Sequence, residues 1–252
     1  MSFERSRCST ATRTRLLLGV TGLAICLDTA VLAQAGNVAE PLRGCSRPVS
    51  ERKVETGCYT TAEATLGELP AGDLFWHLDE FSSRALAESA RGPRGTVTES
   101  FGKHWLFTIA EESWRPSGGE HVASIGPLVV ARDGPYTARY MEALFPPGSQ
   151  PSARLEDAVG AGHRHPGPEA WYVLSGAQCL ETPNGIITVS AGGTAMVPEG
   201  WPMAISDLGT ETRRTVLLVL HPSSEPWNMP IEDPGNPGAP HSHWRPRGLC
   251  PK

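Results

Sequence analysis

The chain has 252 residues, of which 39% are apolar and 19% charged, a composition typical of a folded protein with one large domain or two small ones. The formal net charge of −5 is weak, and the sequence lacks the basic stripe that nucleic-acid binding needs, so we expect no nucleic-acid partner. The 27 Gly and 23 Pro residues favour many tight turns between short strands over long helices.

The first 35 residues differ in kind from the rest. Four arginines precede an apolar run from Leu16 to Ala33 that closes on small residues, the order of a secretory signal peptide. A membrane anchor is the alternative, but Asp28 lies inside the run, and a carboxylate at the centre of a membrane helix costs roughly 2.5–3.5 kcal/mol. Lipidation at Cys26 is a lesser alternative, since Ile25 is too large for a lipoprotein cleavage site. We therefore expect cleavage after residues 1–35 and an exported protein, periplasmic or secreted, with no stable membrane span.

Removal of the leader would leave four cysteines. An even number of cysteines in an exported chain permits two disulfides, with three connectivities. Among these we predict Cys45–Cys58 and Cys179–Cys250, and four free thiols are the alternative.

Residues 36–133 are predicted to form a smaller N-terminal α+β region after a polar connector. Aromatic and apolar runs indicate strands, and a run of good helix formers behind a serine cap indicates a helix. A hairpin-like turn is expected at Gly102-Lys103. The predicted β-α-β-β unit has strands at 73–81, 95–101 and 104–110 and a helix at 82–90.

Residues 134–222 are predicted to be all β. Short strands alternate with turns rich in Gly, Pro and Asn at about ten-residue spacing, which is typical of a small barrel or jelly roll. The expected strands cover 136–145, 170–174, 178–182, 186–189, 194–197 and 215–220. The tail at 223–252 is rich in Pro and Gly and should lie over the surface with little regular structure.

One stretch in this region has the spacing of a metal site. Side chains alternate faces along a strand, so His163 and His165 project to one side while Arg164 points to the exterior or to an interface. The Pro166–Pro168 segment bends the chain before Glu169 begins the next strand. Two imidazoles and one carboxylate suit a divalent transition metal such as Fe, Mn, Zn or Ni. We therefore predict a metal site at His163, His165 and Glu169.

The same stretch resembles the cupin superfamily. The first cupin motif has two His flanking one residue, then a Glu after three or four residues and a Gly after six more. The second motif is Gly-x5-Pro-x-Gly-x2-His, and here it departs at its last position, where Met203 replaces the ligand histidine. The matching residues are His163, His165, Glu169 and Gly176 in the first motif and Gly192, Pro198 and Gly200 in the second. The resemblance covers about 90 residues and implies a mainly β fold with a C-terminal cupin barrel, a double-stranded β-helix or jelly roll.

The departure at Met203 leaves the function open. In one interpretation, three protein ligands hold the metal, and the chain performs metal-dependent chemistry of a dioxygenase, lyase or isomerase type on a small organic molecule. In the other, the metal site has decayed and the barrel is a non-catalytic small-molecule-binding protein, or has only a structural role. Trp171 and Val173 share the parity of Glu169 and should line the cavity with Met203, while Tyr172 faces outward. The resemblance also implies a homodimer.

The remaining histidines are assigned no metal site. His241 and His243 repeat the spacing, but they lie in the Pro-rich tail without a suitably spaced carboxylate, which favours a solvated segment. His77 and His104 lie beside aromatic residues in expected strands and are interpreted as structural, and His121 in an expected loop has no predicted role.

Overall fold

A computed structural model of the chain describes residues 45–52, 56–131, 134–147, 162–229, 231, 241 and 243–251. The predicted signal peptide at 1–35 lies outside these residues. Within them, no helix has the length and apolar character needed to cross a membrane.

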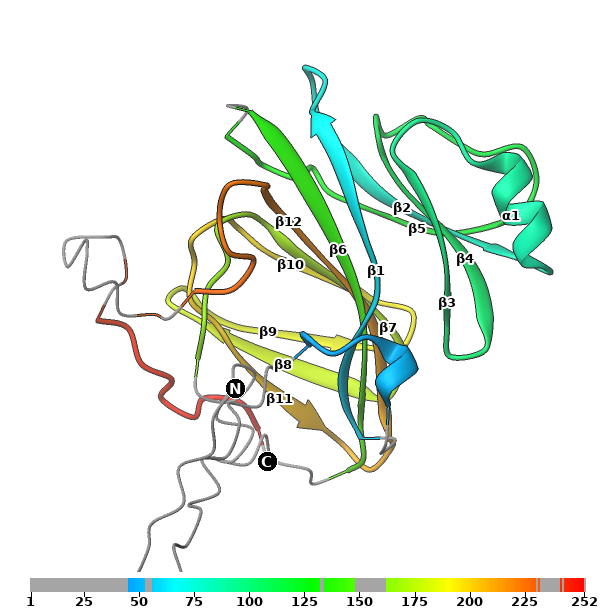
Figure 1. Ribbon diagram of the computed structural model, residues 1–252. Helices are drawn as coiled ribbons and strands as arrows, with labels where there is room; N and C mark the ends of the chain where they lie inside the picture. The colour runs from blue at the N-terminus through cyan, green and yellow to red at the C-terminus, as the bar shows by residue number, and fades with distance from the viewer. Residues whose placement is uncertain are drawn as a thin grey trace, which may run out of the picture. The chain divides into compact units, whose positions relative to one another are not determined.

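The described chain is mainly β, as predicted, and many of its consecutive strands are joined by short turns (Figure 1). The elements are η1 (Val49–Glu51), β1 (Gly57–Glu68), β2 (Phe75–Phe81), α1 (Arg84–Ala90), β3 (Gly95–Ser100), β4 (Lys103–Ala110), β5 (Glu120–Ile125), β6 (Pro135–Phe145), β7 (Glu169–Ser175), β8 (Ala177–Thr182), β9 (Gly185–Ser190), β10 (Thr194–Val197), β11 (Ala204–Leu208) and β12 (Arg213–Pro222).

The strands form three sheets whose pairs are all antiparallel. The five-stranded sheet has the order β1-β6-β12-β7-β10, the three-stranded sheet β11-β8-β9 and the four-stranded sheet β3-β4-β2-β5. The first two face each other across a shared apolar core and form a jelly-roll barrel (Figure 1). Buried side chains of both sheets make this core, among them Met141, Trp171, Leu180, Val189 and Leu217.

A second core lies on the other face of the five-stranded sheet, where the four-stranded sheet packs against it. Strand β12 contributes to both cores: Leu217 and Val219 belong to the barrel interior, and Val216, Leu218 and Leu220 to the second core. A strand buried on both faces needs apolar residues at every position, which explains the unbroken apolar run predicted at 215–220.

The helix and its cap are as predicted. The Ser83 side chain accepts a hydrogen bond from the Leu86 N–H at 3.3 Å, and α1 ends at Ala90 before a loop. The β3–β4 turn is shifted by one residue from the prediction: it consists of Phe101 and Gly102, both with positive φ (52° and 72°). A two-residue turn with two positive φ values matches the twist of a hairpin, which fixes this shift.

Three strands were not predicted: β1, β5 and β11. Strand β1 pairs along its whole length with β6, so hydrogen bonding crosses the predicted boundary between residues 133 and 134. The described part of the predicted N-terminal region therefore contributes an edge strand to the barrel sheet as well as a sheet of its own.

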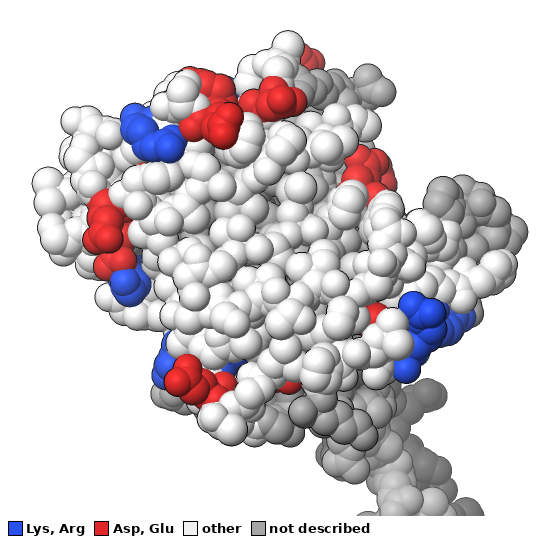
Figure 2. Space-filling model, turned by 180° about the vertical axis from the view of Figure 1, so that it is seen from behind, with Lys and Arg blue, Asp and Glu red and all other residues white. Residues whose placement is uncertain are grey.

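Two disulfides join the four described cysteines in the predicted connectivity, Cys45–Cys58 and Cys179–Cys250. The second ties the C-terminal tail to β8, where the buried Glu181 carboxylate also accepts the backbone N–H groups of Arg247 (2.5 Å) and Leu249 (3.0 Å). Two disulfides fit an oxidising compartment. On the face in Figure 2, charged side chains of both signs lie in small separate groups around a broad uncharged area.

Candidate metal centre

The segment that carries the two histidines is held between two other parts of the chain. The backbone of His163 exchanges both hydrogen bonds with Met203 (3.0 and 2.8 Å), and Arg164 does the same with Met229 (3.2 and 2.9 Å). The Gly200 N–H donates to the His165 carbonyl at 2.8 Å. The histidines therefore lie in an extended segment whose direction is fixed from both sides.

Glu169 opens β7, an inner strand of the five-stranded sheet, and is paired with Val197 of β10 and Val219 of β12. Between the histidines and Glu169 the chain passes very close to β12, because a Cβ on Gly167 would lie 1.8 Å from the Leu220 carbonyl oxygen. Only glycine permits this approach. The bend predicted at Pro166–Pro168 is therefore what brings Glu169 back toward the histidines.

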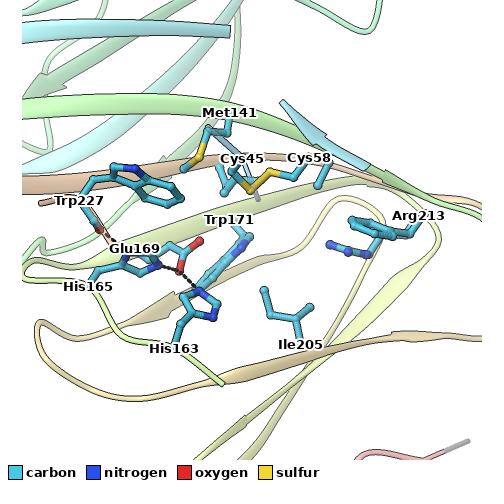
Figure 3. Close-up of a pocket in the computed structure, with 13 residues that line it drawn as sticks. Cys45, Cys58, Met141, His163, His165, Glu169, Trp171, Ile205, Arg213 and Trp227 are labelled. Atoms are coloured by element: carbon cyan, nitrogen blue, oxygen red, sulfur yellow. Dashed lines mark hydrogen bonds and ion pairs between the residues drawn. A yellow bond between two sulfur atoms is a disulfide. The ribbon is translucent and has the colours of Figure 1, made fainter. Parts of the chain in front are cut away.

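The three predicted ligands meet inside the barrel (Figure 3). One ligand atom from each of His163, His165 and Glu169 lies within 4.8 Å of the others, and all three side chains are buried. Glu169 Oε2 is 2.9 Å from His165 Nε2 and 4.0 Å from His163 Nε2. The imidazole rings meet edge to face, with centroids 4.8 Å apart.

The backbone orients His165. Its Nδ1–H donates to the Trp227 carbonyl at 2.6 Å, and the Trp227 indole stacks on the ring at 5.5 Å between centroids. A hydrogen bond from one ring nitrogen to a carbonyl leaves the lone pair on the other nitrogen, the usual arrangement of a metal-binding histidine. Sequence reasoning missed Trp227, which lies in the Pro-rich tail far from either motif.

The donor set fits a cation. His165 Nε2 and Glu169 Oε2 are buried and 2.9 Å apart, yet neither makes a well-directed hydrogen bond. With its proton on Nδ1, His165 turns a nitrogen lone pair toward a carboxylate oxygen, and two such acceptors repel unless a proton or a cation lies between them. Two nitrogens and one oxygen from buried side chains are ligands that a divalent transition metal accepts.

The ligands line a small, largely apolar cavity. The free volume of this cavity is about 20 Å³, roughly room for one or two waters. The Cys45–Cys58 disulfide and Trp227 form one wall (Figure 3). The other lining residues are Met141, Ala143, Phe145, Trp171, Ile205, Arg213 and Leu217.

Arg213 is the only cationic side chain among the residues that line the described cavity, and it faces the triad from the opposite end (Figure 3). It forms an ion pair with Asp207 and donates to Gln178 Oε1 at 2.9 Å. Burial lowers the pKa of the guanidinium, and Asp207 acts in the opposite direction. The charge is therefore held at a fixed place by its partners, as a buried charge requires.

Trp171, Val173 and Met203 were predicted to line the cavity, and one of the three does so. Trp171 lines the cavity. Val173 and Met203 are buried in the same barrel core but are not among the lining residues. Position 203 nevertheless lies directly beside His163 in the backbone pairing, so the departure from the second motif falls next to the predicted ligands.

Two outward-facing residues are covered. Arg164, predicted at the exterior or an interface, is buried because the tail segment around Met229 pairs with it. Tyr172 faces outward as predicted, but it packs partly buried against the second core. In the tail, His241 and His243 are exposed, with the His241 ring 5.3 Å from Trp201.

The two motifs are therefore joined to each other around the triad, through the pairs His163–Met203 and His165–Gly200, inside a barrel of two antiparallel sheets. The barrel has the cupin fold.

Comparisons with known proteins give only distant structural similarity. No protein-family model and no curated protein matches the sequence. Similar solved structures include a cupin superfamily protein from Desulfitobacterium hafniense, with 15% identity over 33% of this chain and 67% of that chain and a TM-score of 0.27. A protein with a double-stranded β-helix domain from Klebsiella pneumoniae is 22% identical over 37% and 74%, with a TM-score of 0.29.

A third similar structure is acireductone dioxygenase from Bacillus anthracis with a cadmium ion in its active centre. It is 13% identical over 31% of this chain and 49% of that chain, with a TM-score of 0.26. Such low scores over a third of the chain say nothing of chemistry. The case for a metal in this cupin barrel therefore depends on its own residues.

Proposed function

We propose that this exported cupin barrel binds a divalent transition metal at His163, His165 and Glu169 and performs metal-dependent chemistry on a small, partly apolar organic molecule. The observation that carries the proposal is the convergence of three buried ligand atoms within 4.8 Å. The facing acceptors of His165 and Glu169 support it, because only a cation or a proton satisfies both.

When bound, the metal would supply Lewis-acid polarisation of a coordinated oxygen or activation of dioxygen. The chain's own residues set the surroundings. Trp227 fixes the His165 ring through its carbonyl, and Trp171 and the other apolar lining exclude bulk water. No carboxylate or imidazole outside the triad lines the described cavity, so proton transfer there falls to Glu169, to water or to the substrate itself.

The size of the cavity restricts the substrate. With room for one or two waters, it admits a larger molecule only if a wall segment moves. The wall made by Trp227 belongs to a described part of the tail that lies outside the named strands, whereas the opposite walls are strands of the barrel. We infer that a substrate enters past Trp227.

Elemental analysis tests the proposal, using protein purified from the exported fraction without chelators or a His tag. We expect close to one equivalent of a transition metal in the wild type and none in the Glu169→Ala variant. Glu199→Gln is the matched control, because this carboxylate is exposed on the neighbouring Pro198–Gly200 turn and should leave the metal in place. Absence of metal after incubation with Fe(II), Mn and Zn would overturn the proposal.

A non-catalytic binding protein is the second candidate, and the buried Met203 beside His163 favours it because a thioether is a poor ligand for hard divalent ions. This candidate predicts a small organic molecule that co-purifies with the protein and stays bound after treatment with a chelator. Release of that molecule together with the metal would contradict it.

A further inference from the structure

A second cluster of histidines with a carboxylate lies on the four-stranded sheet, outside the barrel. It comprises His77 and Asp79 of β2 and His121 and Ser124 of β5, which are adjacent strands. A β-bulge brings these side chains together: Leu78 pairs with Ala123 and Asp79 with His121, so one extra residue of β5 falls between them. Without the bulge, His121 and Ser124 would face opposite sides of the sheet.

Asp79, His121 and Ser124 are hydrogen-bonded in series. Asp79 Oδ1 is 2.8 Å from His121 Nδ1, and His121 Nε2 is 3.0 Å from Ser124 Oγ. Asp79 is fully buried, and its carboxylate contacts the His121 imidazole. A carboxylate on Nδ1 places the ring's proton there and turns the Nε2 lone pair toward the hydroxyl. This is the order of groups that activates a serine nucleophile.

His77 approaches the same hydroxyl from the other side. Its Nε2–H donates to the Glu111 carbonyl at 2.9 Å, which leaves Nδ1 as an acceptor 2.9 Å from Ser124 Oγ. The single hydroxyl proton of Ser124 therefore lies between two ring nitrogens that can both accept it. Burial lowers the pKa of His77, against the hydrogen bond to the Glu111 carbonyl that raises it, so the ring is neutral near pH 7 and its Nδ1 can accept a hydrogen bond.

The cluster is accessible. The His121 side chain is 29% exposed and Ser124 is half-buried, whereas His77 and Asp79 form the floor. An open hollow is lined by Asp73, Phe75, Glu111, Glu112 and Ser113, and it adjoins the cluster through Glu111, whose carbonyl accepts the hydrogen bond from His77. Its three carboxylates repel anions, so a neutral or positively charged molecule is favoured there.

We propose that Ser124 is the nucleophile of a second, acyl-transfer site that acts on small neutral or cationic esters. His121 is its base, and Asp79 and His77 are positioning residues. Ser124 Oγ attacks the ester carbonyl carbon while its proton passes to His121 Nε2. The carbon–oxygen bond to the alcohol then breaks, and the departing alkoxide takes that proton from Nε2.

The acyl-serine left behind is opened by water. His121 Nε2 accepts a proton from the water as it attacks the carbonyl carbon and returns a proton to Ser124 Oγ, which releases a carboxylic acid. No electrons are transferred, and water is the only co-reactant. The site is independent of the metal centre, since none of its groups lines the barrel cavity.

The test uses the full-length mature protein, a fluorophosphonate as covalent probe and p-nitrophenyl acetate as substrate. We expect one adduct per chain by intact mass, mapped to Ser124, and at least a tenfold loss of ester hydrolysis in Ser124→Ala. Ser190→Ala is the control, because this serine ends β9, is exposed and lies far from the cluster in sequence. It should keep wild-type labelling and hydrolysis.

No adduct on Ser124 in the folded wild type would overturn the proposal, whether or not the variants fold. Equal hydrolysis by Ser124→Ala and wild type would do the same. The role of Asp79 as the group that orients His121 is tested by two variants. Asp79→Asn should slow labelling of Ser124 at least tenfold, and Asp79→Glu should restore part of the rate because it returns a carboxylate to His121 Nδ1. Equal labelling rates in Asp79→Asn and the wild type contradict that role. Chelators should not affect labelling, which separates this site from the barrel metal.

Discussion

The described residues include two clusters of two histidines and one carboxylate, and these differ in which groups face their polar atoms. In the four-stranded sheet, every ring nitrogen of His77 and His121 lies within 3.0 Å of a hydroxyl, carbonyl or carboxylate oxygen. In the barrel, His165 Nε2 and Glu169 Oε2 face each other without a hydrogen-bond partner. The first cluster has a serine hydroxyl between its rings, whereas the facing acceptors of the second need a proton or a cation between them.

This difference shows that residue types alone do not identify a metal site. A carboxylate that binds Nδ1 of a histidine and a hydroxyl that binds the other nitrogen use up the lone pairs that a metal would need. A carbonyl on Nδ1 instead presents Nε2 to the interior. The groups that bind the two ring nitrogens of each histidine therefore distinguish a metal site from a serine-based site. Four variants test this distinction.

The largest effect is expected from Gly167→Ala, which alters no ligand. The new Cβ would meet the Leu220 carbonyl oxygen at 1.8 Å, so the chain between His165 and Glu169 must move. We expect urea unfolding to show a loss of more than about 3 kcal/mol and elemental analysis to show loss of the barrel metal. Gly92→Ala is the control, since its new Cβ would meet the Trp114 ring at an ordinary 3.6 Å. A stable, metal-loaded Gly167→Ala protein would contradict the close approach.

Removing the Cys45–Cys58 disulfide, with alanine at both positions, should affect the barrel and spare the sheet cluster. The bridge spans 13 residues of sequence and lines the metal cavity, and closing a loop of that size stabilises a protein by about 3 kcal/mol. We expect that loss in chemical unfolding together with faster release of metal to a chelator. Fluorophosphonate labelling of Ser124 should be unchanged, and a fall in labelling would show that the two sites are coupled.

We expect His77 of the sheet cluster to make the free energy of unfolding fall at acidic pH. Burial lowers its pKa below the ordinary 6.5, so as the pH falls the unfolded state binds this proton at a higher pH than the folded state does. Its contribution to stability is complete above pH 6.5 and is lost as the pH falls through the lowered folded value. The slope is at most about 1.4 kcal/mol per pH unit for one proton. His77→Asn should flatten the unfolding profile below pH 6.5, whereas His243→Asn in the exposed tail should follow the wild type.

The smallest effect is expected from Met203→His, which restores the last position of the second motif beside His163. An added imidazole ligand should tighten metal binding by about tenfold, or about 1.4 kcal/mol. Competition with a chelator measures the change. Unaltered affinity would show that position 203 does not reach the metal, and binding only in the variant would favour a decayed site in the natural protein.

The sequence predicted strands well where they are buried and poorly at sheet edges. Strands such as β12 and β7 have dense apolar residues because both of their faces are covered. The three missed strands, β1, β5 and β11, all lie at an edge of their sheets and carry polar residues such as Glu120, His121 and Asp207. An edge strand needs fewer apolar side chains, so its periodicity is weak.

The candidate sites follow the same division. The barrel triad lies within seven residues of sequence, and a local motif could find it. The Ser124 cluster joins residues 42 and 47 positions apart and depends on a bulge in an edge strand. The carbonyl of Trp227 is 62 residues from His165. No local spacing encodes contacts of this kind, because the tertiary fold creates them.

The double burial of β12 has a consequence for how this strand is aligned. In a half-polar strand, a slip by one residue exposes apolar side chains and is penalised, but residues 216–220 would offer either core an apolar side chain after such a slip. Other contacts must specify the alignment. Arg213, paired with Asp207 and Gln178, fixes one end of the strand, and Gly167 against Leu220 fixes the other. A few non-hydrophobic contacts at its ends thus select the one alignment in which Val219 lies opposite Glu169.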